Sequence, residues 1–213
     1  MTSAVLDDRR LDPQAEFDRQ VDRLVRLKWP RLMGESPAVF VRRVAPLRDA
    51  LAGLPEPVGA RIPFVLVPGE GLVSRVDAVG LTQMDGHAGF TSMPEDDLKR
   101  FVPTSAVEIP DRPYLLVDVD TGPDTIDVVP DEALPMITGA GRSPLTIDEG
   151  LALVIHVPDI LRTRNSFSML ASRCGDRRVP AIWVSDRRPR LGWCWAGAPH
   201  SWLGSASAGD RLS

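Results

Sequence analysis

The sequence has few of the residues that build metal centres, disulfide frameworks and membrane spans. Its only two cysteines are Cys174 and Cys194, and no CxxC pair occurs, which excludes a zinc ribbon on count alone. No apolar run approaches the roughly 18 residues that a membrane helix needs. The first residues, MTSAVLDDRRLDPQ, contain no hydrophobic stretch of signal-peptide length. We therefore expect a cytoplasmic protein with two free thiols and no membrane partner.

The motifs of several common enzyme classes are also missing. The chain contains no P-loop, no HExxH and no GxSxG. The stretch GEGLVS (residues 69–74) follows a predicted strand, but it lacks the third glycine of a dinucleotide-binding fingerprint. Cys174, Cys194 and His200 lie 20 and 6 residues apart, and this spacing matches no established zinc finger. We expect no metal and no cofactor.

Charge is spread unevenly along the chain, and almost all of the positive charge is arginine. Residues 1–53 carry ten basic and eight acidic side chains, residues 54–160 carry six and eighteen, and residues 161–213 carry nine and three. A basic terminal part could dock on the acidic middle, or both could be solvated faces. Alternatively, residues 162–190, with eight arginines and two aspartates, form an anion-binding surface. Because the net charge is −4 and no lysine-rich arm occurs, we expect no nucleic-acid partner.

The length and composition suit a single domain that spans residues 1–213. Hydrophobic residues make up 43% of the chain and charged residues 25%, as is typical of a soluble protein with its own core. We divide it into a helical N-terminal part (1–53), an α+β core (54–205) and a flexible tail of small and polar residues (206–213). The stretch DPQAEFDRQVDRLVRLK (12–28) predicts one N-terminal helix. Ser36-Pro37 opens a second, in which Pro46 predicts a kink or two short helices in tandem.

The rest of the chain alternates between strand and helix patterns. IPFVLVP (62–68) and PYLLVDVD (113–120) predict buried strands, and Asp85-Gly86 predicts a hairpin turn between extended segments. PDEALPMI (130–137) and TIDEGLALVIH (146–156) predict helices, the second with a capping box. VPAIWVS (179–185) and RLGWCW (190–195) predict an antiparallel hairpin. We expect an α+β fold: an N-terminal helical pair, then a mixed or antiparallel sheet with short helices and a C-terminal hairpin rich in tryptophan.

Strand alternation gives the tryptophans of that hairpin a specific arrangement. Trp193 and Trp195 share one face with Leu191, and we expect Trp183 across the hairpin on the same face. Cys194 then points to the opposite face as a small core residue. The pattern favours a packed core cluster of tryptophans over a ligand-stacking surface or a cation cage.

Several stretches together resemble a family of uncharacterised cytosolic proteins found mainly in actinobacteria. They are IPFVLV, PYLLVDVD, PLTIDEG, SRCGDRRVPAIWVS and LGWCWAGAPHSWLGSASAG, in this order. The resemblance covers most of the chain after about residue 15, and its C-terminal motifs are the most specific. It implies single-domain length and a shared fold, and it implies no activity, substrate or cofactor.

Two functional hypotheses follow, and whether the chain is an enzyme stays open between them. In the first, Arg173, Arg177, Arg178 and His200 bind an anionic small molecule or an acidic protein surface, because the arginine fork grips carboxylate and phosphate bidentately. In the second, the chain is a small hydrolase or transferase with Cys174 as nucleophile. Neighbouring arginines would lower the pKa of Cys174, and Asp176 or His200 would orient it or transfer its proton.

Overall fold

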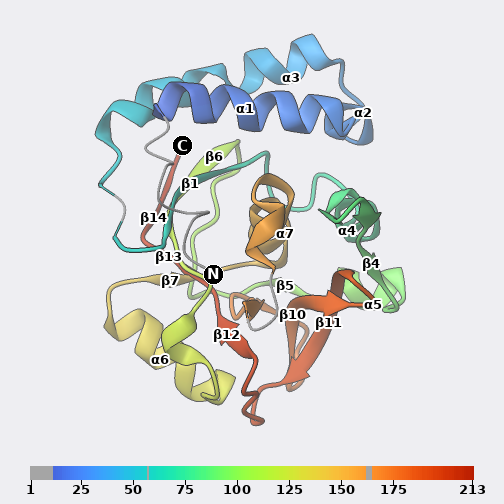
Figure 1. Cartoon of the computed structure of the whole chain (residues 1–213), viewed down its shortest axis with the longest axis vertical. Helices are drawn as coiled ribbons and strands as arrows, with labels where there is room; N and C mark the ends of the chain where they lie inside the picture. The colour runs from blue at the N-terminus through green and yellow to red at the C-terminus, as the bar shows by residue number, and fades with distance from the viewer. Residues whose placement is uncertain (1–11, 57, 162–164) are drawn as a thin grey trace.

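A computed structural model describes residues 12–56, 58–161 and 165–213 of the chain. The fold is α+β, as the sequence predicts, with N-terminal helices preceding a series of strands and short helices (Figure 1). Arg162 and Arg164, two of the arginines in the predicted anion-binding surface, lie outside the described residues.

The N-terminal helices lie together along one side of the molecule (Figure 1). Helix α1 (Pro13–Arg26) begins at Asp12, whose side chain accepts a hydrogen bond from the backbone N–H of Gln14. Helix α2 (Trp29–Leu32) follows, then α3 (Pro37–Val44), which continues as the 3-10 helix η1 (Ala45–Gly53). The predicted break near Pro46 is confirmed, because proline has no N–H to continue the α-helical hydrogen bonding.

The first sheet is antiparallel and has the order β1–β6–β14. It consists of β1 (Ile62–Val67), β6 (Tyr114–Val119) and β14 (Asp210–Leu212). Both predicted buried strands are therefore present. The region 206–213, expected to be a flexible tail, instead forms β13 (Ser207–Ala208) and β14, and Arg211 pairs with Leu116 of β6. Nothing local in this small, polar stretch indicates a strand, since the pairing partner lies far away in the chain.

Short elements connect β1 to β6. They are α4 (Arg75–Leu81), β2 (Gln83–Met84), β3 (His87–Ala88), β4 (Phe90–Thr91), α5 (Glu95–Lys99) and β5 (Val102–Pro103). The hairpin turn at Asp85-Gly86 is present, with positive φ at both residues. The extended segment expected before it is a helix instead, because the Ser74 side chain caps α4 by accepting from the backbone of Asp77.

A buried helix forms the centre of the fold. After the 3-10 turn η2 (Pro123–Thr125), the chain forms α6 (Pro130–Gly139), β7 (Ser143–Pro144), α7 (Ile147–His156) and the 3-10 turn η3 (Pro158–Ile160). Every residue of α7 is buried, and the helix contacts β1 on one side and β10 on the other. The predicted capping box is confirmed: Thr146 and Glu149 bond reciprocally at its first turn.

The second sheet has the order β12–β8–β10–β11–β4 and carries the predicted hairpin. It combines β8 (Ser166–Ser168), β10 (Arg178–Ser185), β11 (Arg188–Trp195) and β12 (Leu203–Ser205) with β4, and β9 (Ser172–Arg173) pairs with β5. A two-residue turn joins β10 to β11. Both of its residues, Asp186 and Arg187, have positive φ (52° and 58°), as this type of tight hairpin requires.

Two hydrophobic clusters form the interior. The larger one surrounds α7 and includes α1, β1 and β6. The smaller one lies between α6 and the strands β10, β11 and β12, and it includes Ala133, Ala181, Cys194 and Leu203. Among the described helices, none combines the length and the apolar character needed to cross a bilayer.

Candidate functional site

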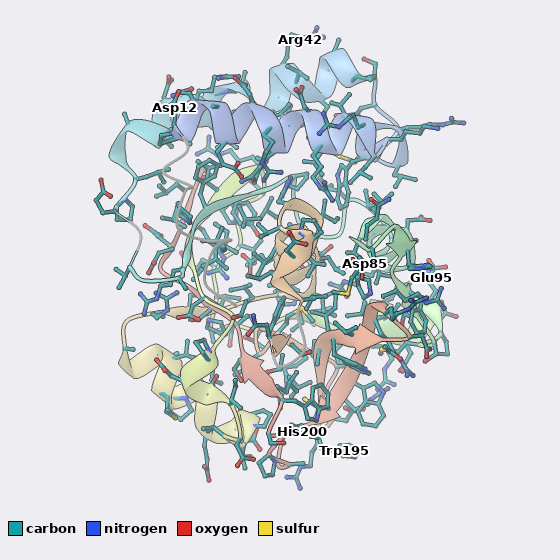
Figure 2. The ribbon with its side chains drawn as sticks, in the orientation of Figure 1. Asp12, Arg42, Asp85, Glu95, Trp195 and His200 are labelled. Atoms are coloured by element: carbon teal, nitrogen blue, oxygen red, sulfur yellow. The ribbon has the colours of Figure 1, made fainter. Side chains whose placement is uncertain are left out.

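A small aromatic pocket lies on the C-terminal hairpin, over the smaller hydrophobic cluster. Its volume is about 250 Å³, and four of the five tryptophans of the chain line it. Figure 2 shows Trp195 and His200 close together at the end of the molecule opposite the N-terminal helices. The complete lining is Ala181, Trp183, Trp193, Cys194, Trp195, His200 and Trp202.

The register of β10 and β11 separates the tryptophans into two groups. Trp183 pairs with Arg190, so its side chain shares a face with those of Arg190 and Cys194, and Gly192 lies between these two on the same face. Trp193 and Trp195 leave the opposite face of β11. The expectation that Trp183 lies on the face of Trp193 and Trp195 is therefore wrong, because a pairing with Arg190 places it one residue out of phase with them.

Each group forms its own ring pair. Trp183 and Trp202 meet edge to face, with ring centroids 6.0 Å apart and an interplanar angle of 66°. Trp193 and Trp195 also meet edge to face, with ring centroids 4.8 Å apart and an interplanar angle of 68°. Trp193, Trp195 and Trp202 are 36%, 51% and 37% exposed, which corrects the expectation that Trp193 and Trp195 belong to a core cluster. Cys194 is buried in the smaller hydrophobic cluster, as predicted.

Gly192 lets the Trp183 ring lie across strand β11. A Cβ atom at this position would stand 2.3 Å from Cη2 of Trp183, closer than side chains ever approach. Glycine inside a strand often marks such a close approach. A glycine at position 192 inside a predicted strand was therefore the sequence signal for this part of the pocket. No pattern near Trp183 in the sequence predicts that Trp202 lies beside it.

His200 closes the pocket next to Trp202, with its ring centroid 5.4 Å from that of the tryptophan. Its backbone carbonyl accepts a hydrogen bond from the N–H of Asp127 (3.0 Å), which ties the pocket loop to the segment before α6. The Nε2 atom of His200 is buried, and within the described part of the chain it has no hydrogen-bond partner. An unsatisfied polar atom in a pocket wall can be satisfied by a ligand.

The three arginines of the anion hypothesis differ in how far other residues engage them. Arg178 donates to Asp97 and to Asp176, with an Nη2–Oδ2 distance of 3.0 Å in the second pair, and its side chain is mostly buried. The Nη2 atom of Arg173 lies 3.8 Å from Oδ1 of Asp131, so these two side chains form a long ion pair. Arg177 is exposed, and among the described residues no acid pairs with it; its guanidinium lies against Gly197, between Trp195 and His200 in the chain.

The surroundings of Cys174 do not favour a reactive thiolate. The thiol is buried and donates a hydrogen bond to Oδ1 of Asp176 at 3.1 Å. Burial, together with this bond, raises the pKa of Cys174 above its usual value, since a donated bond stabilises the protonated form. Asp176 is therefore within reach of Cys174, whereas His200 lines a pocket to which Cys174 does not contribute.

One other place could hold a ligand. A wide, polar hollow of about 840 Å³ lies between residues 106–112 and the C-terminal strand. Of its two arginines, Arg211 is already bonded to the buried Glu149, and Arg112 donates to the backbone carbonyl of Ser213. We therefore regard the smaller aromatic pocket as the better site. Within the described residues, no three His, Cys, Asp or Glu side chains are grouped as metal ligands would be.

A sequence profile for a family of unknown function, DUF5701, matches residues 23–213, the part of the chain that holds the hairpin and the pocket. The chain belongs to the DUF5701 family. No curated protein and no solved structure matches it significantly. The DUF5701 assignment brings no activity with it, so a function has to be argued from the site.

Proposed function

We propose that this DUF5701 protein is a binding protein that recognises its ligand at the aromatic pocket of the C-terminal hairpin. The observation that carries the proposal is the partly exposed Trp202 ring, which meets Trp183 edge to face, beside the Nε2 of His200, which is buried and has no partner among the described residues. Pockets lined by aromatic side chains with a few polar groups are typical of ligand sites. At about 250 Å³, the pocket suits a small molecule, or one chemical group of a larger partner.

A screen by ligand-observed NMR tests this proposal. The mixture holds compact neutral, cationic and anionic compounds, and binding to the wild type is compared with binding to Trp202→Ala. Trp29→Phe serves as control, because Trp29 is buried in the N-terminal helices, outside the pocket. We expect at least one compound that binds the wild type and Trp29→Phe but not Trp202→Ala. No binding compound, or binding that Trp202→Ala leaves unchanged, would refute the proposal.

A second candidate is the binding of an anionic small molecule or an acidic protein surface beside the pocket. Arg177 supports it, because this exposed side chain has no acidic partner in the described part of the chain. Arg173 and Arg178 support it less, since acids already neutralise them. We expect Arg177→Gln to weaken phosphate binding and Arg187→Gln, at the hairpin tip, to leave it unchanged. Equal effects of the two variants would indicate general surface charge only.

A further inference from the structure

We infer that the aromatic pocket binds a methylated ammonium group, of the quaternary type found in choline and betaines. This inference rests on the proposed function and names the chemistry of its ligand. Three properties of the pocket support it: the angles between its rings, the absence of hydrogen-bonding side chains in its lining other than His200 and the tryptophan indoles, and the negative charge beside it.

The rings of the pocket stand at steep angles and form walls. Trp183 and Trp202 meet at 66°, and His200 is tilted by 46° from Trp202. Flat ligands such as nucleobases stack best on a single open ring face. A compact, rounded group instead touches several faces at once, and tryptophan is the side chain whose face attracts a cation most strongly.

The chemistry of the lining selects an ammonium group without N–H donors. Ala181, Cys194 and the tryptophan rings offer no strong acceptor, and Nε2 of His200 is the one buried side-chain nitrogen or oxygen without a partner among the described lining residues. A primary ammonium group has three N–H donors, and because Nε2 of His200 can accept at most one of them, the others would stay unsatisfied, which is costly. A quaternary ammonium group has no donors to satisfy, and its methyl groups suit an apolar wall.

The charge around the pocket favours a cation over an anion. The segment before and at the start of α6 contains Asp124, Asp127, Asp131 and Glu132, all exposed, and no basic residue between positions 121 and 141. Backbone hydrogen bonds from Asp127 to His200 and from Asp131 to Ala196 hold this acidic segment against the pocket loop.

Several arginines near the pocket oppose this negative charge. Arg190 stacks on Trp183 at 5.4 Å and Arg178 on Trp193 at 5.9 Å. Two aspartates neutralise Arg178, and Arg173 pairs with Asp131. Three acids, Asp124, Asp127 and Glu132, then face Arg177 and Arg190, so the net formal charge of these five side chains is negative and favours a cation.

The test compares choline with 3,3-dimethylbutan-1-ol, which has the same shape but carries no charge. Binding is followed through the tryptophan indole N–H signals in the NMR spectrum of the full-length protein, with sodium chloride holding ionic strength constant. Because a cation on an aromatic face gains about 0.5–2 kcal/mol, we expect choline to bind roughly 2- to 30-fold more tightly than the alcohol. We expect Trp202→Leu to abolish this preference and Trp29→Phe to preserve it.

Each outcome decides between the inference and the proposed function. Equal binding of choline and the alcohol would overturn the cationic ligand while leaving a ligand-binding pocket in place. Choline binding that survives Trp202→Leu would place the cation elsewhere and overturn the inference. If neither compound binds, the inference fails, and the NMR screen decides separately whether any ligand enters the pocket.

Quaternary ammonium groups occur both in free small molecules and in lipid headgroups. Two further binding experiments distinguish these sources. Binding of glycine betaine with no co-sedimentation on phosphatidylcholine vesicles indicates a free ligand. Co-sedimentation with phosphatidylcholine but not with phosphatidylglycerol vesicles, lost in Trp202→Leu, indicates a lipid headgroup. If the protein binds neither glycine betaine nor phosphatidylcholine vesicles, and choline does not bind either, the inference is overturned.

Discussion

Removing Arg211 should destabilise the protein more than any exposed ion pair could, because this side chain neutralises a fully buried carboxylate. Glu149 has no exposed surface, and it accepts bonds from Nε and Nη2 of Arg211 at 2.6 and 2.8 Å. The hydroxyl of Tyr114 (2.9 Å) and the backbone N–H of Thr146 (2.8 Å) complete its shell. Arg211→Met keeps the apolar stem of the side chain and leaves Glu149 charged and without its cation.

Removing one partner of a buried ion pair typically lowers the free energy of unfolding by about 3–5 kcal/mol. Arg211 also donates to the Ser143 hydroxyl and the Pro144 carbonyl, so we expect a value at the upper end. Domains typically have an unfolding free energy of about 5–15 kcal/mol, so the variant loses a large share of its stability.

Urea unfolding followed by circular dichroism measures this loss. Arg48→Met is the matched control, because the pair of Arg48 with Asp18 is exposed on both sides and should contribute about 0–1 kcal/mol. The double variant Arg211→Met/Glu149→Gln should recover part of the loss, since no buried charge then remains and glutamine can still serve in the capping box. A loss in Arg211→Met no larger than in Arg48→Met would refute the reasoning.

Three further predictions concern other parts of the fold. Gly192→Ala should displace the Trp183 ring and destabilise the protein by about 1–3 kcal/mol, measured by urea unfolding, and it should weaken choline binding. Burial and Asp148 raise the pKa of Glu70 to about 9 from its ordinary value of 4.5. Between these two values the folded state holds one proton more than the unfolded state, so the free energy of unfolding should fall as the pH rises. The slope is at most about 1.4 kcal/mol per pH unit. Iodoacetamide should alkylate Cys174 with a pH midpoint above the free-thiol value of about 8.5.

Each of these three can fail in a defined way. Gly192→Ala with unchanged stability and unchanged indole signals would contradict the close packing of Trp183 on β11. Glu70→Gln mimics the protonated acid and should flatten the pH dependence; a slope equal to that of the wild type would contradict a neutral Glu70. A midpoint for Cys174 well below 8.5 would instead support the thiol-nucleophile hypothesis, with Cys174→Ser as the control for labelling at Cys194.

Local features of the fold could be predicted from the sequence, because their causes lie within a few residues. Asp12 caps α1, Thr146 and Glu149 form the capping box of α7, and Asp85-Gly86 makes a hairpin turn. The C-terminal hairpin also followed from its own pattern of alternation. These elements depend on hydrogen bonds and backbone conformations that the nearest neighbours in the chain determine.

The sequence pattern drew attention to the C-terminal region that holds the aromatic pocket, but it did not predict how the side chains of the pocket are arranged. His200 and the hairpin tryptophans were singled out, yet the hairpin register decides that Trp183 faces away from Trp193 and Trp195. The partner of Trp183 is Trp202, from a loop beyond β11. A shift of one residue in strand register exchanges the two faces, and no local pattern in these strands fixes that shift.

The sequence by itself determined the class of fold, the caps, the turns and the concentration of arginine and tryptophan near the C-terminus. Only the tertiary structure decided which of those residues are free to bind. It brought Asp97 to Arg178 across 81 positions of the chain, turned Cys174 into a donor to Asp176, and recruited residues 210–212 into a sheet with β6. Charge neutralisation, burial and strand pairing depend on groups distant in sequence, and the packing of the whole chain sets their distances.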